Sequence, residues 1–169
     1  MFKLLVILFL GLLGSSELCW AREPTVDIFS QYDSQLYFSG SFNRGGASFG
    51  AAYEYNQKKL IGFGVYFHHY AEDIAKGATG ASILGAFFSP HIDHGDWDCY
   101  FMTGLAVIKI DKNVSTESGF GPSFAVGVLY HIMDGIAFGI EKLDHFDWAT
   151  SHDKGPIVSD LVAKIRVSF

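Results

Sequence analysis

The sequence is poor in charge and in cysteine. Charged residues make up 18% of its 169 residues, whereas soluble domains typically have about 25%. It has 12 lysines and arginines against 18 aspartates and glutamates, and the net charge of −6 argues against nucleic-acid binding, which requires clustered basic side chains. The cysteines are Cys19 and Cys99. Because Cys19 falls within an N-terminal leader, no internal disulfide is expected, and the fold has to form without one.

Long apolar runs are confined to the N-terminus. Lys3 supplies a positive n-region, residues 4–13 an apolar h-region, and residues 19–21 a small-x-small cleavage site. We therefore expect residues 1–21 to be a cleaved signal peptide and residues 22–169 to form one domain. Beyond the leader, no segment offers the roughly 18 consecutive apolar residues that a membrane-spanning helix requires.

The sequence is rich in apolar and aromatic residues. Hydrophobic residues make up 49% of the chain and aromatic residues 16%. High apolarity without a spanning helix leaves two interpretations: a large buried core in a soluble protein, or strands that face lipid.

Residues 159–169 give the clearest pattern. Apolar side chains occupy one parity (Leu161, Ala163, Ile165, Val167 and Phe169), and mostly polar side chains occupy the other (Asp160, Val162, Lys164, Arg166 and Ser168). Strict alternation predicts a strand with one apolar and one polar face. A soluble domain rarely ends on an apolar strand, whereas a membrane barrel has to pair its last strand with its first.

Similar alternation recurs along the chain between turn-forming residues. Further strands are predicted at 36–42, 47–55, 61–68, 79–88, 99–110, 120–130 and 136–141. Turns are expected at 43–46, 56–59, 90–96 and 133–135, and loops at 70–77, 111–118 and 144–155. About eight strands of about ten residues predict an all-β fold, a closed antiparallel transmembrane β-barrel. Both faces of 79–88 are apolar, which leaves the register of that strand open.

The face opposite the apolar one indicates which side meets lipid. On a soluble, lipocalin-like barrel it would contact water and be rich in lysine, glutamate and threonine. Here it is small (Gly62, Gly64, Gly121, Ser123, Ala125, Gly127, Ala137 and Gly139). Small side chains fit the interior of a narrow barrel of about eight strands. We therefore predict that the apolar face is turned outward.

Four charged residues share the small-residue face: Glu54, Glu141, Lys164 and Arg166. In a barrel interior, buried charges are tolerated only when they are paired. The two acidic side chains can pair with the two basic ones, so that no net charge is buried. We therefore predict a packed lumen charge cluster rather than a polar conduit or an acid–base catalytic pair. Aromatic residues expected at the membrane interface are Tyr55, Trp97, Tyr100, Tyr130, Phe146, Trp148 and Phe169.

The segments Tyr100–Val107 and Gly127–Tyr130, together with the final Phe169, resemble the small outer-membrane β-barrel domains of the OmpA/OmpX/opacity-protein type. The resemblance implies a Gram-negative outer membrane with both termini in the periplasm. We predict a monomer that lacks a wide pore, because about eight strands enclose only side chains. We expect no cofactor, and as partners outer-membrane lipid and the barrel assembly machinery. Phe169 would serve as part of the assembly signal. Such barrels include adhesins, structural anchors and lipid enzymes, so no single activity follows.

Two clusters invite a chemical interpretation. His91 and His94, in the predicted turn 90–96, have side chains that suit zinc, although turns commonly collect such residues. His145 lies where lipid A deacylases of the outer membrane carry a catalytic histidine, but Asp147 takes the place of the nucleophilic serine. We favour a structural or surface-interaction protein whose outer loops contact a ligand. A lipid A deacylase-like enzyme is the alternative, followed by a soluble lipocalin-like binder.

Overall fold

The computed structural model describes residues 32–43, 46–57, 61–71, 80–111, 116–146, 148 and 158–169. Its elements are β1 (Ser34–Asn43), β2 (Gly46–Gln57), β3 (Ile61–Tyr70), β4 (Gly80–His94), β5 (Trp97–Asp111), β6 (Thr116–Met133), β7 (Ile136–His145) and β8 (Val158–Ser168). Among the described residues, no helix is long and apolar enough to cross a membrane.

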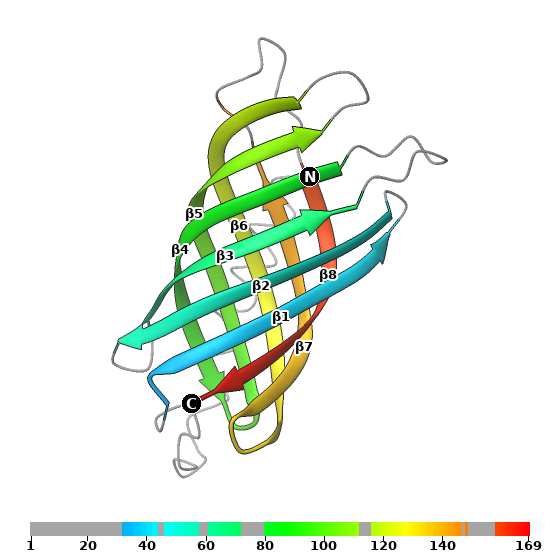
Figure 1. Cartoon of the computed structure of the whole chain (residues 1–169). Helices are drawn as coiled ribbons and strands as arrows, with labels where there is room; N and C mark the ends of the chain where they lie inside the picture. Colours follow the sequence, from blue (N-terminus) through cyan, green and yellow to red (C-terminus); the bar gives the residue numbers. More distant parts are fainter. Residues whose placement is uncertain are drawn as a thin grey trace, which may run out of the picture.

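The strands form one closed antiparallel barrel in which each strand pairs with the next and β8 pairs with β1 (Figure 1). Ser34 and Phe169 exchange backbone hydrogen bonds of 3.2 and 2.9 Å at this seam. Following paired residues once around the barrel from Cys99 leads back to β5 at Lys109, ten residues further along. This stagger requires strongly tilted strands, about 35–45° from the barrel axis. The predicted eight-stranded barrel is confirmed.

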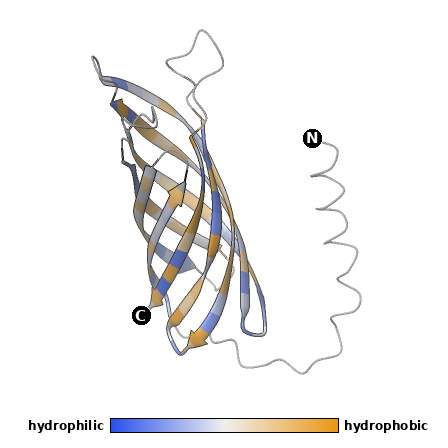
Figure 2. Ribbon diagram, turned by 90° about the vertical axis from the view of Figure 1, so that its right-hand side faces the viewer, coloured by the Kyte–Doolittle hydropathy of each residue, from blue (hydrophilic) through white to orange (hydrophobic). Residues whose placement is uncertain are grey.

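Large apolar side chains cover the outside of the barrel. Exposed examples include Phe38, Phe63, Val65, Leu84, Leu105, Val107, Val126, Phe138, Ile140, Leu161 and Ile165. In Figure 2, hydrophobic and hydrophilic residues alternate along the strands, as expected when successive side chains point to opposite faces. A surface of this kind is compatible with hydrocarbon rather than with water. The predicted outward orientation of the apolar face is confirmed.

The interior is filled by side chains that rely on the small residues opposite them. A Cβ added to Gly127 would lie 2.2 Å from the ring of Tyr100, and one added to Gly62 would lie 1.8 Å from the carboxylate of Glu54. Tyr37 and Arg166 are also fully buried, at 2% and 0% exposure. The glycines on the inward face therefore make room for large polar side chains, and together they leave no wide channel.

The hairpin between β4 and β5 differs from the prediction. Residues 90–96 are not a turn, because β4 continues to His94 and the turn consists of Gly95 and Asp96. Pro90 lacks an N–H donor, and the ladder between β4 and β5 is interrupted there. It resumes without a change of register at His91 and Tyr100. The strand thus tolerates the proline as a local gap in pairing.

Other boundaries also move outward from the predicted ones. β6 begins at Thr116 and β7 ends at His145, so the predicted loops 111–118 and 144–155 are shorter at those ends. The open register of 79–88 is resolved, with Ile83 and Phe87 facing inward. The expected interface position of Tyr100 is wrong, because its side chain is only 5% exposed and lies inside the barrel.

Candidate functional site

A network of buried polar side chains crosses the interior near the barrel end that carries Ser34 and Phe169. Nη1 of Arg166 donates to Oδ2 of Asp98 at 2.5 Å, and both residues are completely buried. Nδ1 of His91 lies 2.9 Å from the same carboxylate, and its Nε2 lies 2.7 Å from Oε1 of Glu54. The Tyr37 hydroxyl donates to Glu54 at 2.9 Å. Side chains from five strands thereby tie the barrel wall together across its lumen.

His91 occupies a special place in this network, because both of its ring nitrogens face carboxylate oxygens. Carboxylates only accept hydrogen bonds, and an imidazole donates from both nitrogens only as a cation. The geometry therefore fits a positively charged His91 between Glu54 and Asp98. In that state His91 adds a third interior cation, which the sequence analysis did not count.

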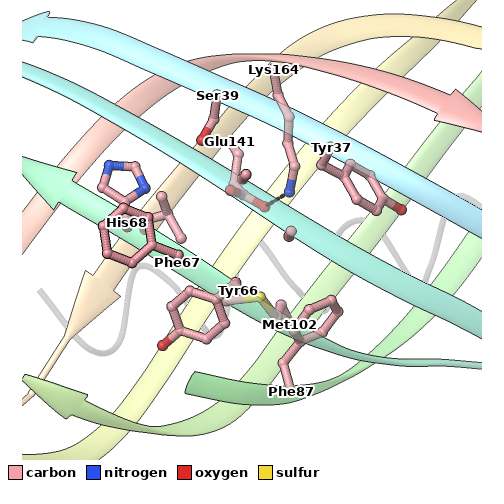
Figure 3. A pocket seen from close by; sticks show the side chains of 12 residues that line it. Tyr37, Ser39, Tyr66, Phe67, His68, Phe87, Met102, Glu141 and Lys164 are labelled. Atoms are coloured by element: carbon pink, nitrogen blue, oxygen red, sulfur yellow. Dashed lines mark hydrogen bonds and ion pairs between the residues drawn. The ribbon is translucent and has the colours of Figure 1, made fainter. Parts of the chain in front are cut away.

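A second contact lies further along the lumen, where Nζ of Lys164 donates to Glu141 at 2.5 Å (Figure 3). The hydroxyl of Tyr100 donates to the same carboxylate at 2.6 Å. The ammonium also lies 4.4 Å from the ring centroid of Tyr37 and 4.9 Å from that of Tyr100. Two aromatic rings and a carboxylate thus replace the water around this charge.

The third polar group lies nearest the opposite end of the barrel. Asp160 accepts hydrogen bonds from Ser41 at 2.8 Å and from Ser48 at 2.5 Å. Nε2 of His68 lies 3.9 Å from the same carboxylate. These contacts join β1, β2, β3 and β8 just beyond Gly40 and Ala163, where the backbone ladder between β1 and β8 ends.

His145, the candidate catalytic histidine, also points into the barrel. Its Nδ1 lies 2.7 Å from Oγ of Ser123, which accepts a hydrogen bond from the Tyr66 hydroxyl at 2.6 Å. His145 and Ser123 are both 0% exposed. Within the described part of the chain, Nε2 of His145 has no partner that would orient it as a base. This serine–histidine contact is therefore sealed from the lipid that surrounds the barrel, and Asp147 lies outside the described residues.

The four predicted lumen charges all lie inside the barrel, but their partners differ from the expected balance of two acids and two bases. Lys164 pairs with Glu141, whereas Arg166 pairs with Asp98 and Glu54 pairs with His91. The sequence analysis missed Asp98 as a lumen acid. Asp98 has the same parity as Tyr100 and Met102, which was the available indication, but it lies between the predicted turn 90–96 and the predicted strand 99–110 and was assigned to neither.

The candidate metal ligands do not converge. The side chain of His91 on β4 points into the barrel, whereas that of His94 is exposed on the opposite face of the same strand. Residues three apart in a strand point to opposite sides. Among the described residues, no group of three or more His, Cys, Asp or Glu side chains is placed to hold a metal ion.

A small cavity separates the groups around Lys164 and His68 (Figure 3). Its volume of about 20 Å³ is enough for about one water molecule. Tyr66, Met102 and Phe87 contribute to the opposite wall. The interior is therefore packed with polar and apolar side chains, and this cavity has no room for a lipid or a sugar.

Solved structures share this architecture. The N-terminal β-barrel domain of Pseudomonas aeruginosa OprF is similar with a TM-score of 0.65 and 12% identity, covering 82% of this chain and 98% of that domain. Neisserial surface protein A is similar with a TM-score of 0.61 and 17% identity, covering 80% of this chain and 94% of that one. The Yersinia pestis outer membrane protein Ail, solved in a phospholipid bilayer nanodisc, has a TM-score of 0.54 and 10% identity, covering 82% of this chain and 100% of that one. No protein-family model matches the chain, and neither does any curated protein.

These likenesses, together with the apolar exterior, define the fold class. The chain is a small eight-stranded transmembrane barrel of the kind found in outer-membrane proteins.

Proposed function

We propose that this protein is an integral outer-membrane barrel with a structural or surface-interaction role and without a wide pore. One observation carries the proposal: exposed apolar side chains cover the outside, whereas the paired charges around Arg166 and Lys164 fill the inside. A soluble lipocalin-like binder requires the reverse arrangement. Residues 1–21, outside the described part of the chain, would be the signal peptide that directs export.

Interaction with a surface ligand is assigned to the end of the barrel opposite Ser34 and Phe169. The segments 70–77, 111–118 and 144–155 connect strands there, and they lie largely outside the described residues. Outer-membrane lipid and the barrel assembly machinery are the other proposed partners, and we propose a monomer. The deacylase alternative is not favoured, because His145 and its serine partner Ser123 are sealed inside the barrel.

Mobility in denaturing gels tests this proposal. The mature chain, refolded in detergent, should migrate faster in an unboiled SDS gel than after boiling, because a closed barrel stays compact and binds less detergent until it is heated. In cells, the protein should stay with outer-membrane fractions after carbonate extraction. A mature chain that stays folded and dissolved in buffer without detergent would overturn the proposal.

Phe169 provides a second test, since we propose that it is part of the assembly signal. Its backbone closes the seam through two hydrogen bonds to Ser34, while its side chain is 61% exposed. Phe169→Ala should lower the amount of assembled protein in the outer membrane severalfold, because the backbone closure persists but the recognised ring is lost. Immunoblots of heat-shifted protein in membrane fractions measure this.

Phe138→Ala is the matched control for Phe169→Ala. Phe138 also faces outward and is 46% exposed, but it lies at the start of β7 rather than at the end of β8. Both variants should show similar stability when refolded in detergent. Equal assembly defects in cells would mean that Phe169 acts only as lipid-facing apolar surface.

A further inference from the structure

The polarity of the barrel wall reverses at one end of strands β3 to β6. At the end opposite Ser34 and Phe169, most inward side chains of β4 and β5 are apolar, including Ile83, Ile108 and Ile110, which are at most 7% exposed, whereas β3 and β6 add inward His68 and Glu117. The outward side chains at the same level are polar. A wall that is apolar inside and polar outside suits water or lipid headgroups rather than hydrocarbon.

Pairing places the outward polar residues in one continuous row. His69 pairs with Ser82, Ser82 pairs with Lys109, and Lys109 pairs with Ser118. We call these four residues the polar row. Neighbouring strands lie about 4.8 Å apart, so four strands give a row roughly 14 Å wide.

An apolar row runs directly beside it, two residues nearer the middle of the same strands. Phe67 pairs with Leu84, Leu84 with Val107, and Val107 with Phe120. All four side chains are exposed, at 39–62%. The two rows lie about 7 Å apart along the strands. Because the strands are strongly tilted, both rows slope relative to the barrel axis, and the change from apolar to polar exterior runs obliquely across β3 to β6.

The polar row contains one cation, Lys109, which is only loosely held. Its Nζ lies 3.5 Å from Oδ1 of Asp111, and both side chains are about half exposed, at 57% and 44%. The same oxygen of Asp111 accepts a hydrogen bond from Thr116 at 3.2 Å. An exposed pair of this kind contributes little stability. Lys109 can therefore exchange this partner for an anionic group at modest cost.

The other members of the polar row add neutral hydrogen-bonding groups. Nδ1 of His69 lies 2.9 Å from Oγ of Ser82, and the His69 ring packs 5.2 Å from that of Phe49, which bounds the row. Ser118 lies on the other side of Lys109 and is exposed. One ammonium flanked by hydroxyls suits a phosphate attached to a sugar, and the width of the row exceeds that of a single phosphate group.

From these observations we propose that the polar row binds the headgroup of a phosphorylated, disaccharide-based glycolipid of the surrounding outer leaflet. The phosphate contacts Lys109, sugar hydroxyls contact Ser82 and Ser118, and the acyl chains lie along the apolar row. This inference rests on the proposed membrane location and adds a specific lipid partner on the side of the barrel.

Lipid titration of the refolded protein in detergent micelles, followed by native mass spectrometry, tests the inference. The probes are diphosphorylated lipid A, the same glycolipid without its phosphates, and phosphatidylglycerol. Lys109→Ala should weaken the binding of diphosphorylated lipid A by about five- to tenfold, as expected for the loss of one charge-assisted contact. The unmodified protein should bind the phosphate-free glycolipid similarly weakly.

Lys142→Ala is the matched control for Lys109→Ala. Lys142 is also an outward lysine near this end, 46% exposed, but its Nζ is bound to Asp144 at 2.7 Å and to Ser159. The affinity of the Lys142→Ala variant for lipid A should match that of the unmodified protein. The unboiled gel shift of every variant shows separately whether the barrel is folded, so a failure of the proposed function is distinguishable from a failure of this site.

Several outcomes would overturn the inference. One is equal affinity of the Lys109→Ala and unmodified proteins, and another is an equal loss in Lys142→Ala. Binding of phosphatidylglycerol as tight as that of lipid A would assign the row to phospholipid instead. Displacement of lipid A by millimolar inorganic phosphate would mean that the row binds a free anion. Binding of the phosphate-free glycolipid at full affinity would exclude recognition of phosphate.

Discussion

Arg166→Ala is expected to lower the free energy of unfolding of the barrel by about 3–5 kcal/mol. The guanidinium of Arg166 and the carboxylate of Asp98 are both completely buried, and they are joined by a 2.5 Å hydrogen bond. Removing the guanidinium leaves the Asp98 carboxylate with His91, which already serves Glu54. Reversible urea unfolding of the barrel in detergent micelles, followed by tryptophan fluorescence, measures the change.

Two further variants separate the buried charge from general damage to the barrel. Lys142→Ala removes an exterior, half-exposed partner of Asp144 and should change stability by about 0–1 kcal/mol. The double variant Arg166→Met with Asp98→Leu replaces the pair by apolar side chains. It should recover much of the lost stability, because the unpaired carboxylate is gone. A double variant no more stable than Arg166→Ala would show that the stranded carboxylate is not the cause.

Gly139→Ala is expected to destabilise the barrel by about 3 kcal/mol or more, or to prevent folding. A Cβ on Gly139 would lie 1.9 Å from the carbonyl oxygen of Val128 and 2.8 Å from Cα of Leu129. Both are backbone atoms of the paired strand β6, so a change of rotamer cannot relieve the contact. β6 and β7 would have to separate locally and lose ladder hydrogen bonds. The yield of heat-shifted barrel and its urea midpoint report the effect.

Gly40→Ala is the matched control, being the same change in another strand. A Cβ there would lie 3.3 Å from the carbonyl oxygen of Ser48, which a small shift can relieve. Its urea midpoint should stay close to that of the unmodified protein. If both glycine variants lost the same stability, the close approach of Gly139 to β6 would not be the cause, since Gly→Ala on its own reduces the entropy of the unfolded chain and favours folding.

Period-two alternation was sufficient to predict the strands. In β8, the apolar parity from Leu161 to Val167 faces outward and the parity of Lys164 and Arg166 faces inward, as predicted. This worked because side-chain direction in a strand depends only on sequence position. The small residues opposite the apolar face then indicated which face would be inside, because a narrow interior admits few large side chains.

Strand ends and side-chain partners were harder to predict. Residues 90–96 have the composition of a turn, yet β4 continues to His94, because it pairs with β3 as far as Pro90 and with β5 again from His91. Tyr100 lies near a strand end, where interface aromatics are common, yet its ring is inside the barrel, where Gly127 opposite it on β6 leaves room for it. Such decisions depend on cross-strand neighbours, which a single stretch of sequence does not contain.

The sequence by itself determined that this chain forms an eight-stranded barrel with an apolar exterior, because alternation and side-chain size are local properties of each strand. Only the tertiary structure decided which charges meet. Arg166 reaches Asp98, 68 residues away, and the polar row unites His69, Ser82, Lys109 and Ser118 from four strands. The physical reason is the stagger of the closed barrel, since its register, set by all eight pairings together, fixes which residues of different strands become neighbours.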